Sequence, residues 1–181
     1  GNIRTWQTGP NAWTHFTHDE QQTLMTTWCI ARSPLIIGAN LPKNDEFTLS
    51  LLTNDEVLAV DQHSTNNHQV SRTDDLIVWS ADVPASHDKY VALINAQEYP
   101  VDPNAPRPAT APAGARRGRT PPPATMPGKP TPVSISLQSL GLTGPVKVRD
   151  LWSHKDLPDA AETLTATLTP HQSALYRVSP K

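Results

Sequence analysis

Hydrophobic positions in the first third of the chain follow a helical period. Thr17 to Glu20 reads Thr-His-Asp-Glu, a capping box in which the Thr hydroxyl and the Glu carboxylate each accept a free backbone N–H. The predicted helix ends at Ser33-Pro34, because proline lacks a donor and disfavours helix at the residue before it. Its apolar face consists of Leu24, Met25, Trp28 and Cys29.

A short, wholly apolar run follows this helix. Leu35–Gly38 has no polar alternation, which favours a strand covered on both faces, as in a parallel sheet. Asp45–Leu52 predicts a short helix, and a second capping box at Thr53–Glu56 opens another helix that runs through Val60. Helix, buried strand and helix make an α/β fragment that is too small to close a sheet alone.

From His68 onward the period of the pattern changes to two. Apolar residues alternate with Ser, Thr, Lys and Arg, which predicts half-buried antiparallel strands, and Gly, Pro, Asp and Ser clusters supply the turns. About seven strands in a row predict an all-β antiparallel sandwich. The strand-like segments are Leu76–Val83, Tyr90–Asn95, Val133–Leu137, Val146–Val148, Leu164–Leu168 and Ala174–Val178.

Residues 100–132 interrupt the strand pattern. They hold 11 of the 19 prolines and almost no large apolar residues. Such a segment cannot bury enough surface to offset the entropy of ordering it, so we predict a disordered insertion between two strands. A Pro-rich docking motif is the alternative. The basic cluster Arg116–Arg119 inside it has no neighbouring aromatic residue and is interpreted as a solvated loop.

Composition gives no reason to expect nucleic acid, a membrane or a cofactor as partner. The formal net charge is −2 and the pI is about 6.4. No apolar run approaches the roughly 20 residues that a membrane span needs. Cys29 is the only cysteine, which excludes an internal disulfide, and its apolar neighbours favour a small buried hydrophobe over a nucleophile.

Candidate catalytic residues have simpler structural explanations. Ser64 with His63 and Asp61 could suggest a hydrolase triad, but no Gly-x-Ser-x-Gly elbow surrounds the serine. Two histidine pairs lack the His-Glu-x-x-His pattern of a zinc site, and these are His15/His18 and His63/His68. Most carboxylates lie in turns or in helix first turns, where they favour the helix dipole. The residues alone therefore predict no catalytic, cofactor-binding or metal-binding site.

Several long strings carry a resemblance in both order and spacing. They are Phe16–Trp28, Arg32–Gly38, Leu51–Gln62, Leu142–Trp152 and Lys155–Leu157. Together they resemble glycoside hydrolase family 27, the α-galactosidases and α-N-acetylgalactosaminidases. The resemblance implies that residues 1–62 are the last helix–strand–helix of a (β/α)8 TIM barrel, and that residues 63–181 are the C-terminal β-sandwich domain with the insertion at 100–132.

The resemblance also implies a function in carbohydrate metabolism. Family members are retaining hydrolases that use two carboxylates on earlier barrel strands. By this alignment both carboxylates lie upstream of Gly1, so we expect no catalytic residue here and expect the chain alone to be inactive. Its substrate-binding residues stay unknown. Gly38–Leu41 matches the loop at the barrel rim, where Asn40-Leu41 replaces the Asp-Leu that is frequent in the family.

We therefore expect the C-terminal part of an α-galactosidase-like enzyme. Its substrates would be α-galactoside oligosaccharides or glycoconjugates bound by the missing barrel, and secretion or periplasmic export follows from the resemblance only. One alternative is a structural partner that completes a barrel supplied by another chain. The other is a glycan-binding sandwich without catalysis, with an aromatic platform chosen from Trp79, Tyr90, Trp152 and Tyr176, although strand aromatics are more often core residues.

The resemblance has a physical consequence for the first helix. A helix that packs on absent barrel strands should expose Leu24, Met25 and Trp28 when the chain is alone. Such a surface drives association between molecules, whereas residues from about 66 onward could fold by themselves.

Overall fold

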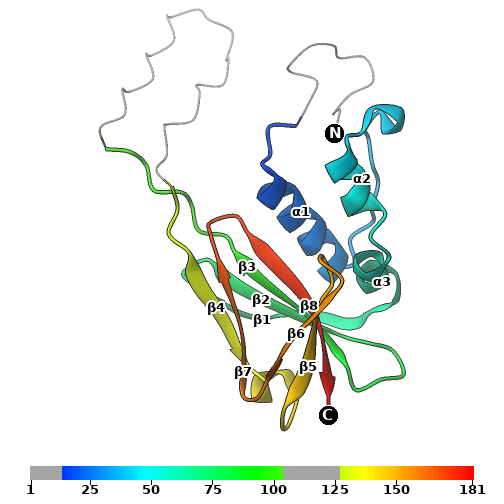
Figure 1. The fold of residues 1–181 in the computed structure, drawn as a ribbon, viewed down its shortest axis with the longest axis vertical. Coiled ribbons are helices and arrows are strands. Elements are labelled where there is room, and N and C mark those ends of the chain that lie inside the picture. Colours follow the sequence, from blue (N-terminus) through cyan, green and yellow to red (C-terminus); the bar gives the residue numbers. More distant parts are fainter. Residues whose placement is uncertain (1–13, 104–126) are drawn as a thin grey trace, which may run out of the picture.

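The computed structural model describes residues 14–103 and 127–181, and these form three layers (Figure 1). Helices α1 (His18–Ile30), α2 (Glu46–Leu52) and α3 (Asp55–His63) make the first layer. The middle layer is a six-stranded antiparallel sheet in the order β1-β2-β3-β8-β5-β6. The third layer is a two-stranded antiparallel sheet of β4 and β7. The strands are β1 (Thr65–Thr73), β2 (Leu76–Asp82), β3 (Lys89–Asn95), β4 (Thr131–Ser136), β5 (Val146–Asp150), β6 (Lys155–Ala160), β7 (Thr163–Leu168) and β8 (Ser173–Pro180).

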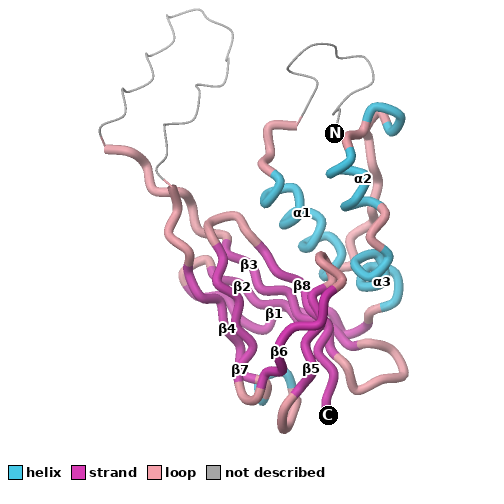
Figure 2. Tube along the Cα trace, viewed as in Figure 1, coloured by secondary structure: helices cyan, strands magenta, loops and turns pink. Residues whose placement is uncertain are grey.

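A first hydrophobic core lies between the two sheets. Val91 and Val178 from the large sheet meet Val133 and Leu164 from the small one, and all four side chains are buried. Alternation along β4 and β7 leaves serines and threonines outside, as the period of two requires. The predicted antiparallel β-sandwich is therefore confirmed, and Figure 2 shows how the strands dominate the chain after the three helices.

A second core lies between the helices and the opposite face of the large sheet. Met25 and Cys29 of α1 pack there with Val57 of α3 and with Leu175 of β8. Met25 is only 5% exposed, so the prediction that it would be exposed is wrong, because α1 turns this side toward the sheet. Leu24 and Trp28 on the other side are 36% and 38% exposed, as expected.

Each of the three helices begins with an N-cap residue whose side chain accepts a backbone N–H. The first capping box is confirmed, since Glu20 N donates to Thr17 Oγ1 at 3.2 Å and Thr17 N donates to Glu20 Oε2 at 2.7 Å. The second capping box, predicted at Thr53–Glu56, does not form. Asn54 rather than Thr53 is the N-cap of α3, and its Oδ1 accepts Val57 N at 3.0 Å. Glu56 is thereby free to bind elsewhere.

The predicted strand at Leu35–Gly38 does not form. This segment is irregular, and Ile36 and Ile37 are 84% and 42% exposed. A strand requires a hydrogen-bonded neighbour, and within the described residues no strand lies beside this run. Ile36 and Ile37 are therefore left at the surface, whereas Leu35 packs against the second core.

Two strands lack any sequence signal. β1 and β6 occupy the two edges of the large sheet and are mostly polar and exposed, so neither shows the alternation of a half-buried strand. Pro158 in β6 is tolerated because an edge strand needs fewer ladder donors. β4 begins at Thr131, inside the predicted insertion, and the central part of that insertion lies outside the described residues.

The helices and the sandwich share one continuous packing arrangement. The last helix ends at His63 and β1 begins at Thr65, with Ser64 buried between them. The division into domains at residues 62 and 63 stays a prediction, because the second core joins side chains from both sides of that point.

Candidate functional site

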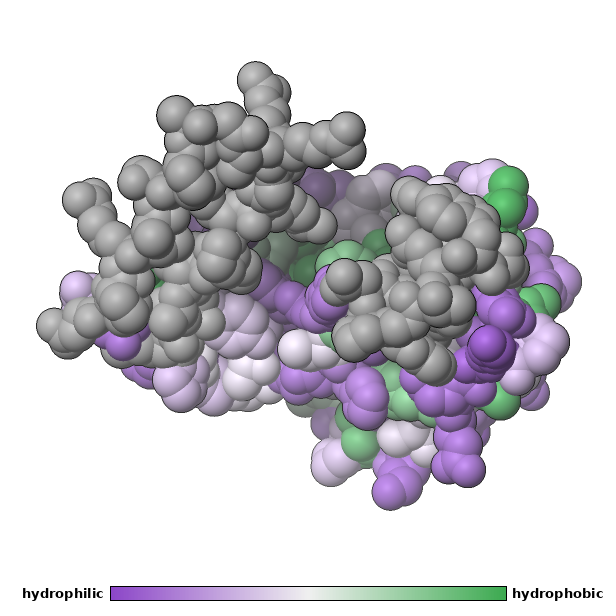
Figure 3. Space-filling model, turned by 90° about the horizontal axis from the view of Figure 1, so that it is seen from above, coloured by the Kyte–Doolittle hydropathy of each residue, from purple (hydrophilic) through white to green (hydrophobic). Residues whose placement is uncertain are grey.

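An apolar hollow lies between α1 and α2. It has a volume of about 400 Å³, and its lining includes Phe16, Leu24, Met25, Trp28, Ile36 and Leu51. We call it the apolar groove. Figure 3 looks onto this end of the molecule and shows hydrophobic residues among hydrophilic ones. The groove offers contact area but few polar groups, so it fits a packing surface better than a site of chemistry.

The apolar groove follows from the two-sided character of α1. Met25 and Cys29 belong to the buried core against the sheet, whereas Leu24 and Trp28 stay partly exposed along the groove. A helix with apolar residues on both sides needs a second layer to cover the outer side. The exposed segment with Ile36 and Ile37 lies along the same groove.

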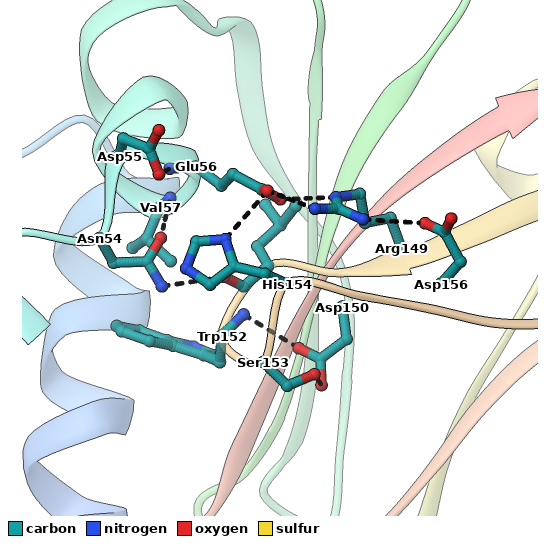
Figure 4. A network of polar contacts seen from close by, with 11 residues as sticks. Asn54, Asp55, Glu56, Val57, Arg149, Asp150, Trp152, Ser153, His154 and Asp156 are labelled. Atoms are coloured by element: carbon teal, nitrogen blue, oxygen red, sulfur yellow. Dashed lines mark hydrogen bonds and ion pairs between the residues drawn. The ribbon is translucent and has the colours of Figure 1, made fainter. Parts of the chain in front are cut away.

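A polar cluster joins the helical layer to the sheet on another side (Figure 4). The Arg149 guanidinium donates to both carboxylate oxygens of Glu56, Nε to Oε2 at 2.8 Å and Nη2 to Oε1 at 2.6 Å. Arg149 Nη1 also donates to Asp156 Oδ1 at 3.0 Å, and His154 Nδ1 lies 2.9 Å from Glu56 Oε1. The hydrogen bonds from Arg149 hold the pKa of Glu56 below its usual range, so this carboxylate is a structural anion.

Buried polar contacts reinforce the same junction. Asn54 Nδ2 donates to the Leu151 carbonyl at 2.9 Å. The Trp152 indole Nε1 donates to Thr26 Oγ1 at 2.9 Å, and Ser173 Oγ lies 3.0 Å from the same oxygen. Because buried polar groups must find partners, these contacts fix how the helices sit on the sandwich.

The serine triad considered above is not assembled. Ser64 is fully buried, and its hydroxyl donates to the Val60 carbonyl and accepts from Asn67 Nδ2. Asp61 contributes its backbone carbonyl to Arg32 Nε at 3.0 Å. Ser64 therefore ends a helix and has no access to a substrate.

The candidate histidines do not form a metal site. His18 stacks on Phe47 with ring centroids 3.8 Å apart, and His68 Nδ1 contacts the Asn66 carbonyl. Across residues 14–103 and 127–181, no three His, Cys, Asp or Glu side chains lie close enough to hold a metal ion. No described helix has the length and apolar character needed to cross a membrane.

The aromatic residues that could have formed a glycan platform are core residues. Tyr90 and Tyr176 are buried, at 6% and 8% exposure. Trp79 and Trp152 pack against the second core. Burial raises the pKa of both tyrosines, which agrees with their position.

Sequence reasoning missed the contacts between helix carboxylates and the sandwich. Glu56 and Arg149 are 93 positions apart, and Glu20 and His171 are 151 apart. Helix-dipole complementarity explains each glutamate locally, so no spacing signal points to a distant partner.

Comparison with known proteins identifies the sandwich. Residues 73–178 match the profile of the alpha galactosidase C-terminal beta sandwich domain. The chain belongs to this family. It is similar to an alpha-galactosidase of Oryza sativa subsp. japonica, with 26% identity over 165 residues that cover 89% of this chain and 32% of that protein.

Solved structures agree with this assignment. A glycoside hydrolase family 27 β-L-arabinopyranosidase from Geobacillus stearothermophilus is 40% identical with a TM-score of 0.73, over 92% of this chain and 31% of that one. A candidate α-N-acetylgalactosaminidase from Bacillus halodurans is 31% identical with a TM-score of 0.76, over 99% of this chain and 36% of that one. The chain is thus a C-terminal portion of a family 27 protein and spans about a third of the length of its relatives.

Proposed function

We propose that this chain is the C-terminal part of a retaining glycoside hydrolase that releases terminal α-linked galactose. Its catalytic carboxylates would lie upstream of Gly1, on barrel strands that this chain does not contain. Among the described residues, Glu20 and Glu56 bind a cap, a histidine or an arginine. Asp82 and Asp88, which line one hollow, are paired with Lys89 and Arg177. Residues 1–181 alone would then be inactive.

The apolar groove carries this proposal. The upstream barrel that we propose would need a surface to pack against, and among the described residues the groove is an apolar surface that is left uncovered. The unpaired segment at Ile36 and Ile37 has the composition of a buried parallel strand and lies along that surface. We propose that upstream strands of the barrel cover both.

The pocket of the proposed upstream barrel would decide which sugar the enzyme releases. The relatives include α-galactosidases and a β-L-arabinopyranosidase. The two sugars share ring stereochemistry, and galactose carries an additional hydroxymethyl group at C5. We propose galactose as the main substrate, and secretion or periplasmic export stays our expectation from the family resemblance.

Hydrolysis assays test the proposal directly. We expect p-nitrophenyl α-galactoside to be cleaved by the polypeptide extended upstream through a whole barrel, and not by residues 1–181. p-Nitrophenyl β-L-arabinopyranoside, assayed beside it, decides between the two sugars. Turnover by residues 1–181 alone would contradict the placement of the carboxylates.

A structural role in completing a barrel supplied by another chain is the second candidate, because the same groove would receive either partner. Co-purification of residues 1–181 with a separate larger polypeptide, and activity of that pair, would favour it. The glycan-binding alternative has less support, since Tyr90 and Tyr176 are buried in the two cores.

A further inference from the structure

Two turns of the sandwich present a histidine to a helix glutamate. His171 Nδ1 lies 2.9 Å from Glu20 Oε1 of α1, and His154 Nδ1 lies 2.9 Å from Glu56 Oε1 of α3. Both histidines occupy left-handed backbone positions, with φ of 64° and 54°. The helical layer is therefore joined to the sandwich twice by the same pair of chemical groups.

We propose that the Glu20–His171 contact is a proton-dependent latch, which holds α1 on the sandwich at mildly acidic pH and weakens as the pH rises. The ligand of this latch is the proton itself. The proposal concerns the junction within this chain and does not depend on the enzymatic activity proposed above.

The backbone around His171 fixes the imidazole in place. His171 N donates to the Asn95 carbonyl at 2.8 Å, and the His171 carbonyl accepts Thr23 Oγ1 at 2.8 Å. The Tyr99 ring meets the imidazole edge-on, with centroids 4.9 Å apart. The side chains of His171 and Glu20 are each 25% exposed, so the contact is partly screened from water.

The charged groups recorded against His171 in the described chain are carboxylates. Glu20 faces it from α1, and Glu98 Oε2, from the segment after β3, lies 3.7 Å from Nε2. Asp19 lies next to Glu20, and its Oδ2 accepts a hydrogen bond from the side-chain amide Nε2 of Gln172 at 3.2 Å. From β8 and the β7–β8 turn the neighbours are neutral, being Gln172 and Ser173. A proton on the imidazole would therefore have a carboxylate near each ring nitrogen.

His154 provides an internal contrast. It faces the same kind of carboxylate, but Arg149 already binds both oxygens of Glu56, and Arg149 also holds Asp156. Lys155 is the next residue along the turn. A proton on His154 would therefore add a second cation beside an existing one, and we assign the pH response to His171.

The direction of the pH dependence follows from the charge states of Glu20 and His171. A proton on His171 adds the Coulomb attraction between opposite charges to a hydrogen bond that the Glu20 carboxylate already accepts. The latch is therefore stronger in mild acid, where the imidazole is protonated, and weaker as the pH rises. Burial raises the pKa of Glu20, but hydrogen bonds from Thr17 and His171 outweigh it and hold the pKa below its usual range. Glu20 therefore stays ionised in mild acid.

A double-mutant cycle on residues 1–181 tests the latch. Glu20→Gln keeps an oxygen for the capping box but removes the charge, and its amide can donate to a neutral imidazole. His171→Asn removes the titrating group and tolerates the left-handed backbone. Urea unfolding of both single variants and the double variant, at about pH 5.5 and about pH 8, gives the coupling between the two side chains.

We expect the coupling to favour folding roughly two- to five-fold at the lower pH and to be smaller at the higher pH. The matched cycle of Glu56→Gln with His154→Asn should show a smaller change with pH. Equal coupling of Glu20 and His171 at both pH values, or stronger coupling at the higher one, would overturn the latch. If a His171 variant does not fold, hydrogen-exchange protection of the α1 amides is compared between wild type and Glu20→Gln. In that comparison, the same loss of protection at both pH values would also overturn it.

Discussion

Arg149 of β5 donates two parallel hydrogen bonds to the Glu56 carboxylate of α3, Nε to Oε2 at 2.8 Å and Nη2 to Oε1 at 2.6 Å. The two side chains are 36% and 25% exposed, so water screens the contact only in part. A planar guanidinium can satisfy both carboxylate oxygens at once, whereas an ammonium group acts as a single point charge. The pair thus fixes the orientation of α3 on the sheet as well as its position.

Replacing this arginine should loosen the junction. We expect Arg149→Lys to lower the urea midpoint of unfolding, because one of the two parallel bonds is lost, and Arg149→Met to lower it further. Lys155→Met, in the exposed β6 edge strand, is the matched control and should leave the midpoint unchanged. An Arg149→Lys protein as stable as the wild type would show that the fork geometry is not needed.

Stability in acid should depend on Glu56. Its pKa is lowered first by the Arg149 hydrogen bonds, then less strongly by His154. A lowered pKa in the folded state means that the stabilisation is present above the unfolded-state pKa of about 4.3 and is lost as the pH falls through the folded-state value. Acid titration of Glu56→Gln should therefore show a flatter decline of stability below about pH 4.3 than the wild type does.

The control for this titration is a neighbouring exposed carboxylate. Asp55 lies next to Glu56 at the start of α3 and is exposed. Asp55→Asn should keep the wild-type slope in acid. A flattened slope in both variants would mean that the first-turn charge, rather than the ion pair with Arg149, sets the acid response.

Asn54 should be intolerant of substitution because both ends of its amide are used. The side chain is 6% exposed, with Oδ1 accepting from Val57 N and Nδ2 donating to the Leu151 carbonyl. Asn54→Ala loses the cap and leaves a buried carbonyl unpaired, which should cost about 2–4 kcal/mol. Asn54→Asp keeps the cap but sets a charge against that carbonyl, and should also be strongly destabilising.

The cap of α2 separates the two contributions of Asn54. Asp45 caps that helix by accepting from Thr48 N at 2.7 Å, and it is exposed. Asp45→Ala should cost about 1 kcal/mol in chemical unfolding, the usual value for a lost cap. A similar loss for Asn54→Ala would show that the bond to Leu151 contributes little.

Cys29 should be chemically silent in the folded chain. It is fully buried in the second core, and burial followed by the nearby charge of Asp61 raises the pKa of its thiol to about 12. The thiolate is the reactive form, so iodoacetamide should not modify native protein at about pH 8 and should modify it fully in urea. Mass spectrometry reads the outcome, and rapid native labelling would show that α1 separates from the sheet.

Local chemistry explains how far the sequence predicted this fold. Thr17 and Glu20 predicted the start of α1 because both partners of the capping box lie within one turn. The edge strands β1 and β6 were missed because they bury little and show no period. The strand predicted at Leu35–Gly38 was wrong because a strand needs a neighbour, and none of the described strands pairs with it.

The site contacts were beyond sequence reasoning for a similar reason. Glu56 had a sufficient local explanation at a helix N-terminus, so its bonds to Arg149 and His154 could not be inferred. Met25 was expected on the exposed face because the helical pattern alone does not say that α1 is covered on one side by the sheet and open on the other.

The open side of α1 leads to the last prediction. Trp28 and Ile36 line the apolar groove and are 38% and 84% exposed, so residues 1–181 should self-associate through this surface. Trp28→Gln and Ile36→Gln should reduce the associated fraction in sedimentation velocity. Val101→Gln, an equally drastic change at a side chain that is 57% exposed outside the groove, should not. In the polypeptide extended through a whole barrel, the same two groove variants should instead destabilise the protein, because the proposed upstream strands would bury these positions. Groove variants that leave both the association of the short chain and the stability of the long one unchanged would contradict the assignment of this surface to the upstream polypeptide.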